Sequence, residues 1–183
     1  MTNSTRSIAF SALFIALITV CSWISIPFAV PFTLQTFAIY ITCVILGGKQ
    51  GFFTILIYMA LGAVGLPVFS GFKGGLGALL GPTGGYIAGF LIIALVIWIS
   101  TRIFNTKPAV IIASSALGLI LLYAFGTIWF MYVYIQTKGA ISLMSVLSMC
   151  VFPFIIPDII KIALAIILGT RIKKLIPSAD SYK

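Results

Sequence analysis

The feature that most constrains this chain is an acid and a base three residues apart inside a long apolar segment. Asp158 and Lys161 are the only charged residues in the run CVFPFIIPDIIKIALAIILG. A charged side chain at bilayer depth is costly, so it usually faces a polar interior and serves a ligand, an ion or a partner. The pair therefore predicts a polar site within a membrane-spanning bundle.

The composition indicates that most of the chain lies in lipid. Of 183 residues, 62% are hydrophobic, two are acidic and none is histidine, and the mean hydropathy is +1.27. A spanning helix needs about 20 mostly apolar residues. The sequence thus predicts an all-α integral membrane protein, a bundle of six transmembrane helices forming one membrane domain over residues 1–183. The expected spans are 6–26, 34–46, 52–64, 84–103, 109–136 and 148–172.

The basic residues predict the orientation of these spans. Cytoplasmic loops are enriched in Lys and Arg. A cytoplasmic N-terminus leaves Lys73 and Lys138 outside and places eight basic residues inside: Arg6, Lys49, Arg102, Lys107, Arg171, Lys173, Lys174 and Lys183. We therefore expect a multi-pass protein with both termini in the cytoplasm and the lipid bilayer as its surroundings.

The second and third spans are too short to cross the bilayer unaided. Each has about 13 residues, or about 20 Å of helix, which is roughly 10 Å less than the hydrocarbon thickness. Short, Gly-interrupted segments often accompany a binding site. We expect the long Gly-rich connection 66–82, between the third and fourth helices, to cap a ligand pocket as a lid, with Val68, Phe69, Phe72 and Leu76 sealing it. An ordinary surface loop is the alternative.

Several function classes are disfavoured. The glycines near Gly74 lack the Gly-Lys-Ser/Thr of a phosphate-binding loop, and the acids are too few for paired-carboxylate or metal catalysis. The three cysteines have no metal-site spacing. The net charge of +9 is dispersed over the span ends, which does not fit a nucleic-acid groove. We expect no enzyme activity, no metal, no cofactor and no nucleic-acid partner.

Four stretches carry a resemblance to a known family: VPFTLQT (30–36), GAVGLPVFSGFKGG (62–75), GPTGGYIAGF (81–90) and PFIIPDIIK (153–161). Together they resemble the BioY family, the biotin-specific S components of energy-coupling factor (ECF) vitamin transporters. The resemblance implies a subunit of the prokaryotic plasma membrane that binds biotin with high affinity near the outer face. It also implies a coupling module of a transmembrane T component and two ATPase subunits, with Ala12 and Ala16 matching the family's contact motif for the T component.

Biotin offers a ureido group with two N–H donors and a carbonyl, a thioether ring and a carboxylate tail. Asp158 can accept from the N–H groups and Lys161 can donate to the carbonyl. The reverse polarity, with Lys161 on the carboxylate, stays open. Gln35 and Tyr86 are expected in the pocket wall, while Tyr40 suits the pocket or the membrane interface equally. Further candidates are Thr33, Phe69, Gly74, Gly75 and Trp129, and the tail is expected at the glycine loop, Thr33 or Lys73.

Three alternatives remain at this point. The chain can be an ion- or proton-coupled carrier of a small polar solute, with Asp158 as the titrating acid. It can be a structural subunit of a membrane complex. The Asp158–Lys161 pair can also be a buried salt bridge that no ligand contacts, although such bridges are poor sources of stability.

Overall fold

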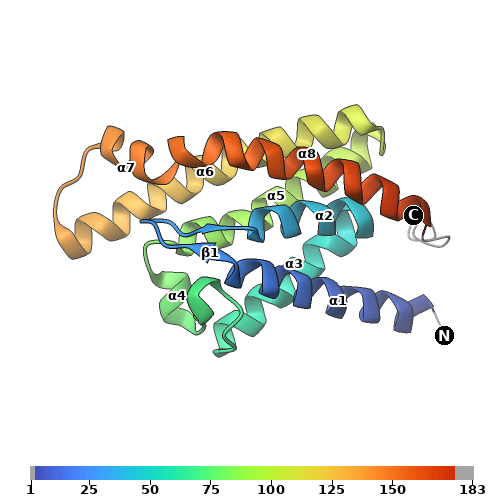
Figure 1. The fold of residues 1–183 in the computed structure, drawn as a ribbon, viewed down its shortest axis with the longest axis horizontal. Helices are drawn as coiled ribbons and strands as arrows, with labels where there is room; N and C mark the ends of the chain where they lie inside the picture. Colours follow the sequence, from blue (N-terminus) through green and yellow to red (C-terminus); the bar gives the residue numbers. More distant parts are fainter. Residues whose placement is uncertain (1–2, 176–183) are drawn as a thin grey trace.

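The computed structural model describes residues 3–175, and α-helices dominate them (Figure 1). The helices are α1 (Asn3–Trp23), α2 (Gln35–Leu46), α3 (Gly48–Val64), α4 (Leu76–Leu80), α5 (Gly84–Phe104), α6 (Pro108–Lys138), α7 (Leu143–Cys150) and α8 (Phe152–Leu175). A short antiparallel hairpin, β1 (Ser25–Ile26) and β2 (Phe32–Thr33), joins α1 to α2, and a 3₁₀ turn, η1 (Ser70–Phe72), follows α3.

Four segments of the described chain are long and apolar enough to cross a membrane: Thr5–Trp23, Gly84–Phe104, Pro108–Lys138 and Leu143–Leu175. Helices α2 and α3 are apolar but shorter, with 12 and 17 residues. At 1.5 Å per residue they reach about 18 and 26 Å. The prediction of a short second helix is confirmed, whereas the third is longer than expected.

The third helix begins four residues earlier than the sequence predicted, because its glycines are packing positions. A Cβ on Gly48 would collide with the Trp98 backbone of α5, and one on Gly51 would lie 3.0 Å from the Cα of Cys43 in α2. Close helix contacts of this kind override the weak helix propensity of glycine. The GGKQG segment is therefore mostly the first turn of α3 and only briefly a loop.

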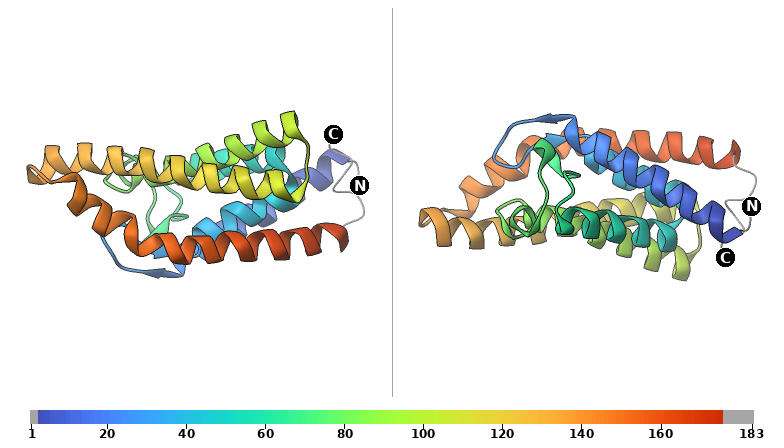
Figure 2. Two further views of the ribbon diagram at one scale, coloured as in Figure 1. Left: turned by 90° about the horizontal axis from the view of Figure 1, so that it is seen from above. Right: turned by 90° about the horizontal axis from the view of Figure 1, so that it is seen from below.

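The last predicted span, 148–172, is also wrong at its start. The structure has two helices here, and they are separated at Val151, whose φ of −126° and ψ of −60° are not helical. Pro153 then lies in the first turn of α8, where backbone N–H groups have no intrahelical partner and proline is tolerated. The bend between α7 and α8 is visible in Figure 2.

The connection between α3 and α5 is more ordered than the predicted loop 66–82. It contains η1 and the short helix α4. Val68 and Phe69 are buried, as a sealing role requires, but Phe72 and Leu76 are 65% and 63% exposed. Phe72 instead packs against the ring of Trp23, with centroids 4.9 Å apart. The prediction that all four apolar residues seal a pocket is thus wrong for Phe72 and Leu76.

Glycines also join α5 and α6 closely. A Cβ on Gly118 would lie 3.2 Å from the Cα of Ile93, and one on Gly89 would lie 3.0 Å from the side chain of Leu122. Helix α2 is buried along nearly its whole length at the centre of the bundle. These contacts fix the positions of α2, α5 and α6 relative to one another.

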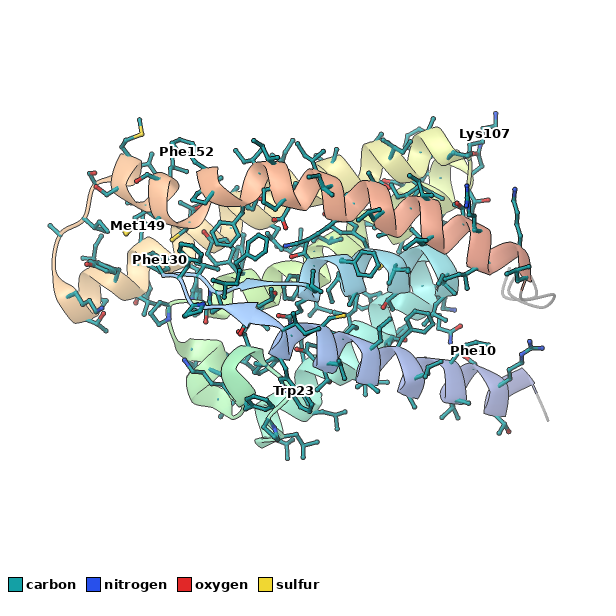
Figure 3. The ribbon with its side chains drawn as sticks, viewed as in Figure 1. Phe10, Trp23, Lys107, Phe130, Met149 and Phe152 are labelled. Carbon is teal, nitrogen blue, oxygen red and sulfur yellow. The ribbon has the colours of Figure 1, made fainter. Side chains whose placement is uncertain are left out.

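The two ends of the molecule differ in what they carry. The ends of the described chain lie together at one end, beside the α5–α6 turn (Figure 1). Figure 3 shows Lys107 at this end, whereas Phe130, Met149 and Phe152 lie toward the other. Helices α5 and α8 begin in that second half of the molecule.

Candidate functional site

A cavity of about 440 Å³ lies among the starts of α2, α5 and α8. Its size falls in the range of small-molecule sites. The β1–β2 hairpin contributes Phe28, Ala29, Val30, Pro31 and Thr33, and α2 contributes Gln35 and Thr36. The α3–α5 connection contributes Phe69, Ser70, Lys73, Gly74, Gly77, Ala78, Gly81, Pro82 and Thr83. Helices α5, α6, α7 and α8 contribute Tyr86, Ile87, Phe90, Leu122, Tyr123, Cys150, Phe154, Asp158 and Lys161.

Asp158 and Lys161 form the charged part of the cavity wall. They are 3% and 5% exposed, and Lys161 Nζ lies 2.9 Å from Asp158 Oδ1. They are one turn apart on α8, which places them on the same face of the helix. The other carboxylate oxygen, Oδ2, accepts a 2.7 Å hydrogen bond from the Tyr123 hydroxyl of α6. The Lys161 ammonium also lies 4.1 Å from the centroid of the Phe32 ring.

In this arrangement both charged groups keep unused hydrogen-bonding positions. A carboxylate offers about four acceptor positions, and an ammonium has three donors. Asp158 has one protein partner on each oxygen, and Lys161 gives one hydrogen bond to Asp158. The pair can therefore present an acceptor and a donor side by side to a ligand in the cavity.

The start of α2 contributes a neutral polar wall. The Thr33 hydroxyl accepts from the backbone N–H of Gln35 at 3.2 Å, which ties the end of the hairpin to the helix. The Gln35 side chain is almost fully buried and donates from Nε2 to the hydroxyl of Tyr58 in α3 at 2.8 Å. Tyr58 in turn donates to the carbonyl of Val68 at 2.8 Å.

The α3–α5 connection is fixed to the helices beside the cavity. Phe69 is 2% exposed, and its ring packs edge-on against Tyr58 with centroids 5.6 Å apart. It occupies the space over Gly62, where any Cβ would collide with the ring. Trp23 of α1 donates to the Pro67 carbonyl at 2.8 Å. Gly74 also lines the cavity, and a Cβ at this position would collide with the Leu66 carbonyl, so a side chain would not fit.

Tyr86 supplies the α5 side of the cavity. Its hydroxyl lies 3.2 Å from the Thr127 hydroxyl of α6, and either oxygen can be the donor. The ring packs over Gly126, where a Cβ would clash. Seven of the predicted ligand residues thus surround one cavity: Asp158, Lys161, Gln35, Tyr86, Thr33, Phe69 and Gly74.

The other three predicted residues do not line it. Tyr40 is fully buried and donates to the Ser115 carbonyl at 3.1 Å, a contact between α2 and α6. Gly75 makes a turn with φ of +85° and donates its N–H to the Gly62 carbonyl at 2.7 Å. Trp129 donates to the Gly81 carbonyl at 3.0 Å and packs on Gly85, so that it joins α6 to the start of α5.

Tyr123, Cys150 and Phe154 line the cavity but were not predicted. Tyr123 is one of several aromatic residues in α6, and nothing local distinguishes it from a lipid-facing ring. Its role follows from its position opposite Asp158, which only the packing of α6 against α8 creates. Phe154 had a usable signal, because it lies four residues before Asp158 and so one turn away on the same face.

The cavity is equipped for binding more than for catalysis. Within residues 3–175, no group of three or more His, Cys, Asp or Glu side chains gathers to hold a metal ion. Apolar walls from Phe28, Phe90 and Phe154 surround the polar groups. Apolar surface with a few convergent polar groups is typical of a small-molecule site.

Comparisons with known proteins agree on one family. Residues 1–178 match the BioY family. A biotin transporter BioY of Thermotoga maritima is 40% identical over 171 residues, which is 93% of this chain and 97% of that protein. A probable biotin transporter BioY of Pyrococcus horikoshii is 38% identical over 169 residues, 92% and 96% of the two chains.

A solved structure shares the fold. The crystal structure of the S-component for biotin from an ECF-type ABC transporter superposes with a TM-score of 0.80 at 29% identity, covering 95% of each chain. This match and the apolar helices indicate a multi-pass membrane protein with an S-component fold. The chain belongs to the BioY family.

Proposed function

We propose that this protein is the high-affinity biotin-binding S component of an ECF vitamin importer and delivers biotin to an ATP-driven coupling module. The observation that carries the proposal is the cavity of about 440 Å³ with the Asp158–Lys161 pair in its wall. It occurs in a chain whose relatives are biotin transporters over nearly their full lengths. No enzyme activity, metal or cofactor is needed for this role.

The Asp158–Lys161 pair holds the ureido ring of biotin. Asp158 accepts from a ureido N–H, and Lys161 donates to the ureido carbonyl, which carries the complementary polarity. Hydrogen bonds to charged groups contribute about 1.5–3 kcal/mol each. The site supports this assignment because both side chains are buried, adjacent and already oriented by Tyr123 and Phe32.

The remaining cavity residues fit the rest of the ligand. Gln35, Thr33 and Tyr86 provide polar wall, and Phe69 and Gly74 bring an aromatic ring and a close backbone against it. The carboxylate tail extends toward Lys73, an exposed residue that also lines the cavity. Tyr40, Gly75 and Trp129 support the fold behind this wall and do not contact biotin.

Six segments of a single membrane domain cross the bilayer: α1, α2, α3, α5, α6, and the combined α7–α8. The basic residues that the sequence assigns to the cytoplasm include Lys107, which lies at the end of the molecule where the described chain begins and ends. Since positive charge favours the cytoplasmic side, both termini face the cytoplasm and the cavity lies toward the outside. The α3–α5 connection covers it there.

The coupling module consists of a T component and two ATPase subunits and binds on the α1 side. Ala12 and Ala16 are exposed on α1, next to exposed Ile8, Leu13 and Val20. Small residues at four-residue spacing let two helices approach closely. Replacing both alanines by leucine should abolish co-purification of the module and leave biotin binding by the isolated subunit unchanged.

Calorimetric titration of the purified chain with biotin tests the main proposal. Tight binding with a stoichiometry near one is expected, and no heat of binding would refute the proposal. A second titration with biotin methyl ester, which lacks the free carboxylate, tests the polarity of the site. The ester should bind with a modest loss, whereas a loss as large as that of Lys161 substitution would place the carboxylate on Lys161.

A further inference from the structure

Tyr58 of α3 lies behind the cavity wall and connects three parts of the chain. Its side chain is fully buried. The hydroxyl receives a hydrogen bond from Gln35 Nε2 at 2.8 Å and gives one to the Val68 carbonyl at 2.8 Å. Gln35 lines the cavity, whereas Tyr58 does not. The hydroxyl of Tyr58 therefore acts on a ligand through the Gln35 amide rather than by direct contact.

The single proton of this phenol is committed to Val68. A backbone carbonyl has no proton to give, so the 2.8 Å hydrogen bond to Val68 uses the one proton of the Tyr58 hydroxyl. Ser22 of α1 also donates to the Val68 carbonyl at 2.7 Å, sharing its proton with the Thr19 carbonyl, and the two lone pairs of the Val68 oxygen accept from both hydroxyls. Tyr58 can consequently meet Gln35 only as an acceptor.

This constraint fixes the amide of Gln35. An amide has a donor end and an acceptor end, and only the NH₂ group can face an oxygen that is already donating elsewhere. The carbonyl oxygen Oε1 then points away from Tyr58. Among residues 3–175 no group donates a hydrogen bond to Gln35 Oε1. This oxygen is also not a fully buried atom without a partner, so it is accessible from the cavity that Gln35 lines.

We infer that Tyr58 is a positioning residue that holds the Gln35 carbonyl toward the cavity and makes this part of the wall an acceptor subsite for an N–H group of the ligand. The inference rests on the proposed function and adds a second, neutral acceptor to the charged one at Asp158. With the opposite orientation Gln35 would present NH₂ and favour ligand carbonyls. Tyr58 thus determines which polarity this wall selects.

The experiment compares Tyr58→Phe with Tyr40→Phe. Both changes remove one hydroxyl from a fully buried tyrosine that donates to a backbone carbonyl, but Tyr40 lies off the cavity and does not contact Gln35. Tyr58→Phe should weaken biotin binding about two- to tenfold, as expected for one neutral hydrogen bond. Tyr40→Phe should leave the affinity within about twofold.

Selectivity separates a positioning role from a structural one. Biotin and an analogue methylated on its ureido nitrogens, which has lost N–H donors, are titrated into each variant. Tyr58→Phe lets the amide turn, so the preference for biotin over the analogue should fall, while Tyr40→Phe should keep it. An unchanged preference in Tyr58→Phe, or an equal fall in both variants, would overturn the inference.

Melting temperatures measured without ligand test the inference independently of the proposed function. Residues that share a hydrogen bond lose stability non-additively. The melting-temperature loss of Tyr58→Phe with Gln35→Met should be smaller than the sum of the single losses, and Tyr40→Phe with Gln35→Met should be additive. Additive losses in the first pair would overturn the inference, whereas failure of the unmodified protein to bind biotin would overturn only the proposed function.

Discussion

Two polar clusters meet at the cavity, and they are built differently. Asp158 and Lys161 lie three residues apart on α8 and form a buried ion pair with Tyr123 as a third partner. Gln35 and Tyr58 belong to different helices and form a neutral chain that ends at the Val68 carbonyl. The first cluster contains two charges that must compensate each other inside an apolar interior. The second cluster is neutral, and its hydrogen bonds only fix which groups donate and which accept.

This difference predicts different consequences of substitution. Removing one member of a buried ion pair leaves an uncompensated charge and costs about 3–5 kcal/mol. Removing one neutral hydrogen bond costs about 0.5–1.5 kcal/mol. We therefore expect the charged cluster to supply most of the binding free energy and the neutral cluster to supply selectivity.

The largest effect is expected from Lys161→Met. The substitution leaves Asp158 charged and buried with only Tyr123 as a partner, so the melting temperature should fall strongly and biotin binding should be lost. Thermal unfolding in detergent and calorimetric titration measure the two quantities.

The double variant Asp158→Asn/Lys161→Met is the control for this prediction. It removes both charges together, so most of the lost stability should return while binding stays at least about 100-fold weaker than in the unmodified protein. Recovery of binding along with stability would show that the pair is a structural salt bridge that the ligand does not contact.

Tyr123→Phe should have the next largest effect on affinity. It removes the hydroxyl that donates to Asp158 Oδ2 at 2.7 Å and frees the carboxylate to rotate. Hydrogen bonds to charged groups are worth about 1.5–3 kcal/mol, so biotin should bind roughly 10- to 100-fold more weakly. Tyr132→Phe, nine residues further along α6 at an exposed position, is the matched control and should have no effect. Equal affinities for Tyr123→Phe and the unmodified protein would separate Tyr123 from the charged cluster.

Gly62→Ala tests the link between the neutral cluster and the α3–α5 connection. Its Cβ would collide with the Phe69 ring and push it from its place against Tyr58. Overpacking of this kind costs about 1–3 kcal/mol, and biotin should dissociate several-fold faster, as measured by exchange of radiolabelled ligand.

The same substitution at Gly77 is the control for that test. A Cβ there meets no atom within 4 Å, although Gly77 also lines the cavity. Gly77→Ala in α4 should leave the melting temperature unchanged or slightly raised, because alanine favours a helix over glycine. If both variants released biotin at the normal rate, Phe69 would not help to close the site.

Trp129→Phe is expected to have the smallest effect. It removes one hydrogen bond to the Gly81 carbonyl, which costs about 1 kcal/mol of stability. Because Trp129 does not line the cavity, the biotin affinity should stay within about twofold in a titration. A tenfold loss would return Trp129 to the binding site.

The two clusters also show how far the sequence alone could reach. An acid and a base in an otherwise apolar helix are visible in the sequence, because the cost of burying them limits what they can do. Gln35 was within reach as a polar residue at the start of a short apolar helix. Tyr58 was not, because its role depends on three segments separated by ten or more residues.

The same contrast applies to the fold. The long apolar helices could be predicted from composition and length, and their bounds agree closely with the structure for α5 and α6. The start of α3 and the break at Val151 could not be predicted, since the first depends on Gly48 packing against Trp98 and the second on local backbone angles. The contact of Gly48 with Trp98 is a tertiary effect that overrides the local propensity of glycine.

The most direct single measurement is a high-resolution structure of the protein with biotin bound. It should show the ureido ring beside α8, with Asp158 and Lys161 at hydrogen-bond distances of about 2.7–3.2 Å from its N–H and carbonyl groups. A ureido ring elsewhere in the cavity, with the Asp158–Lys161 pair untouched by the ligand, would contradict the role proposed for the ion pair.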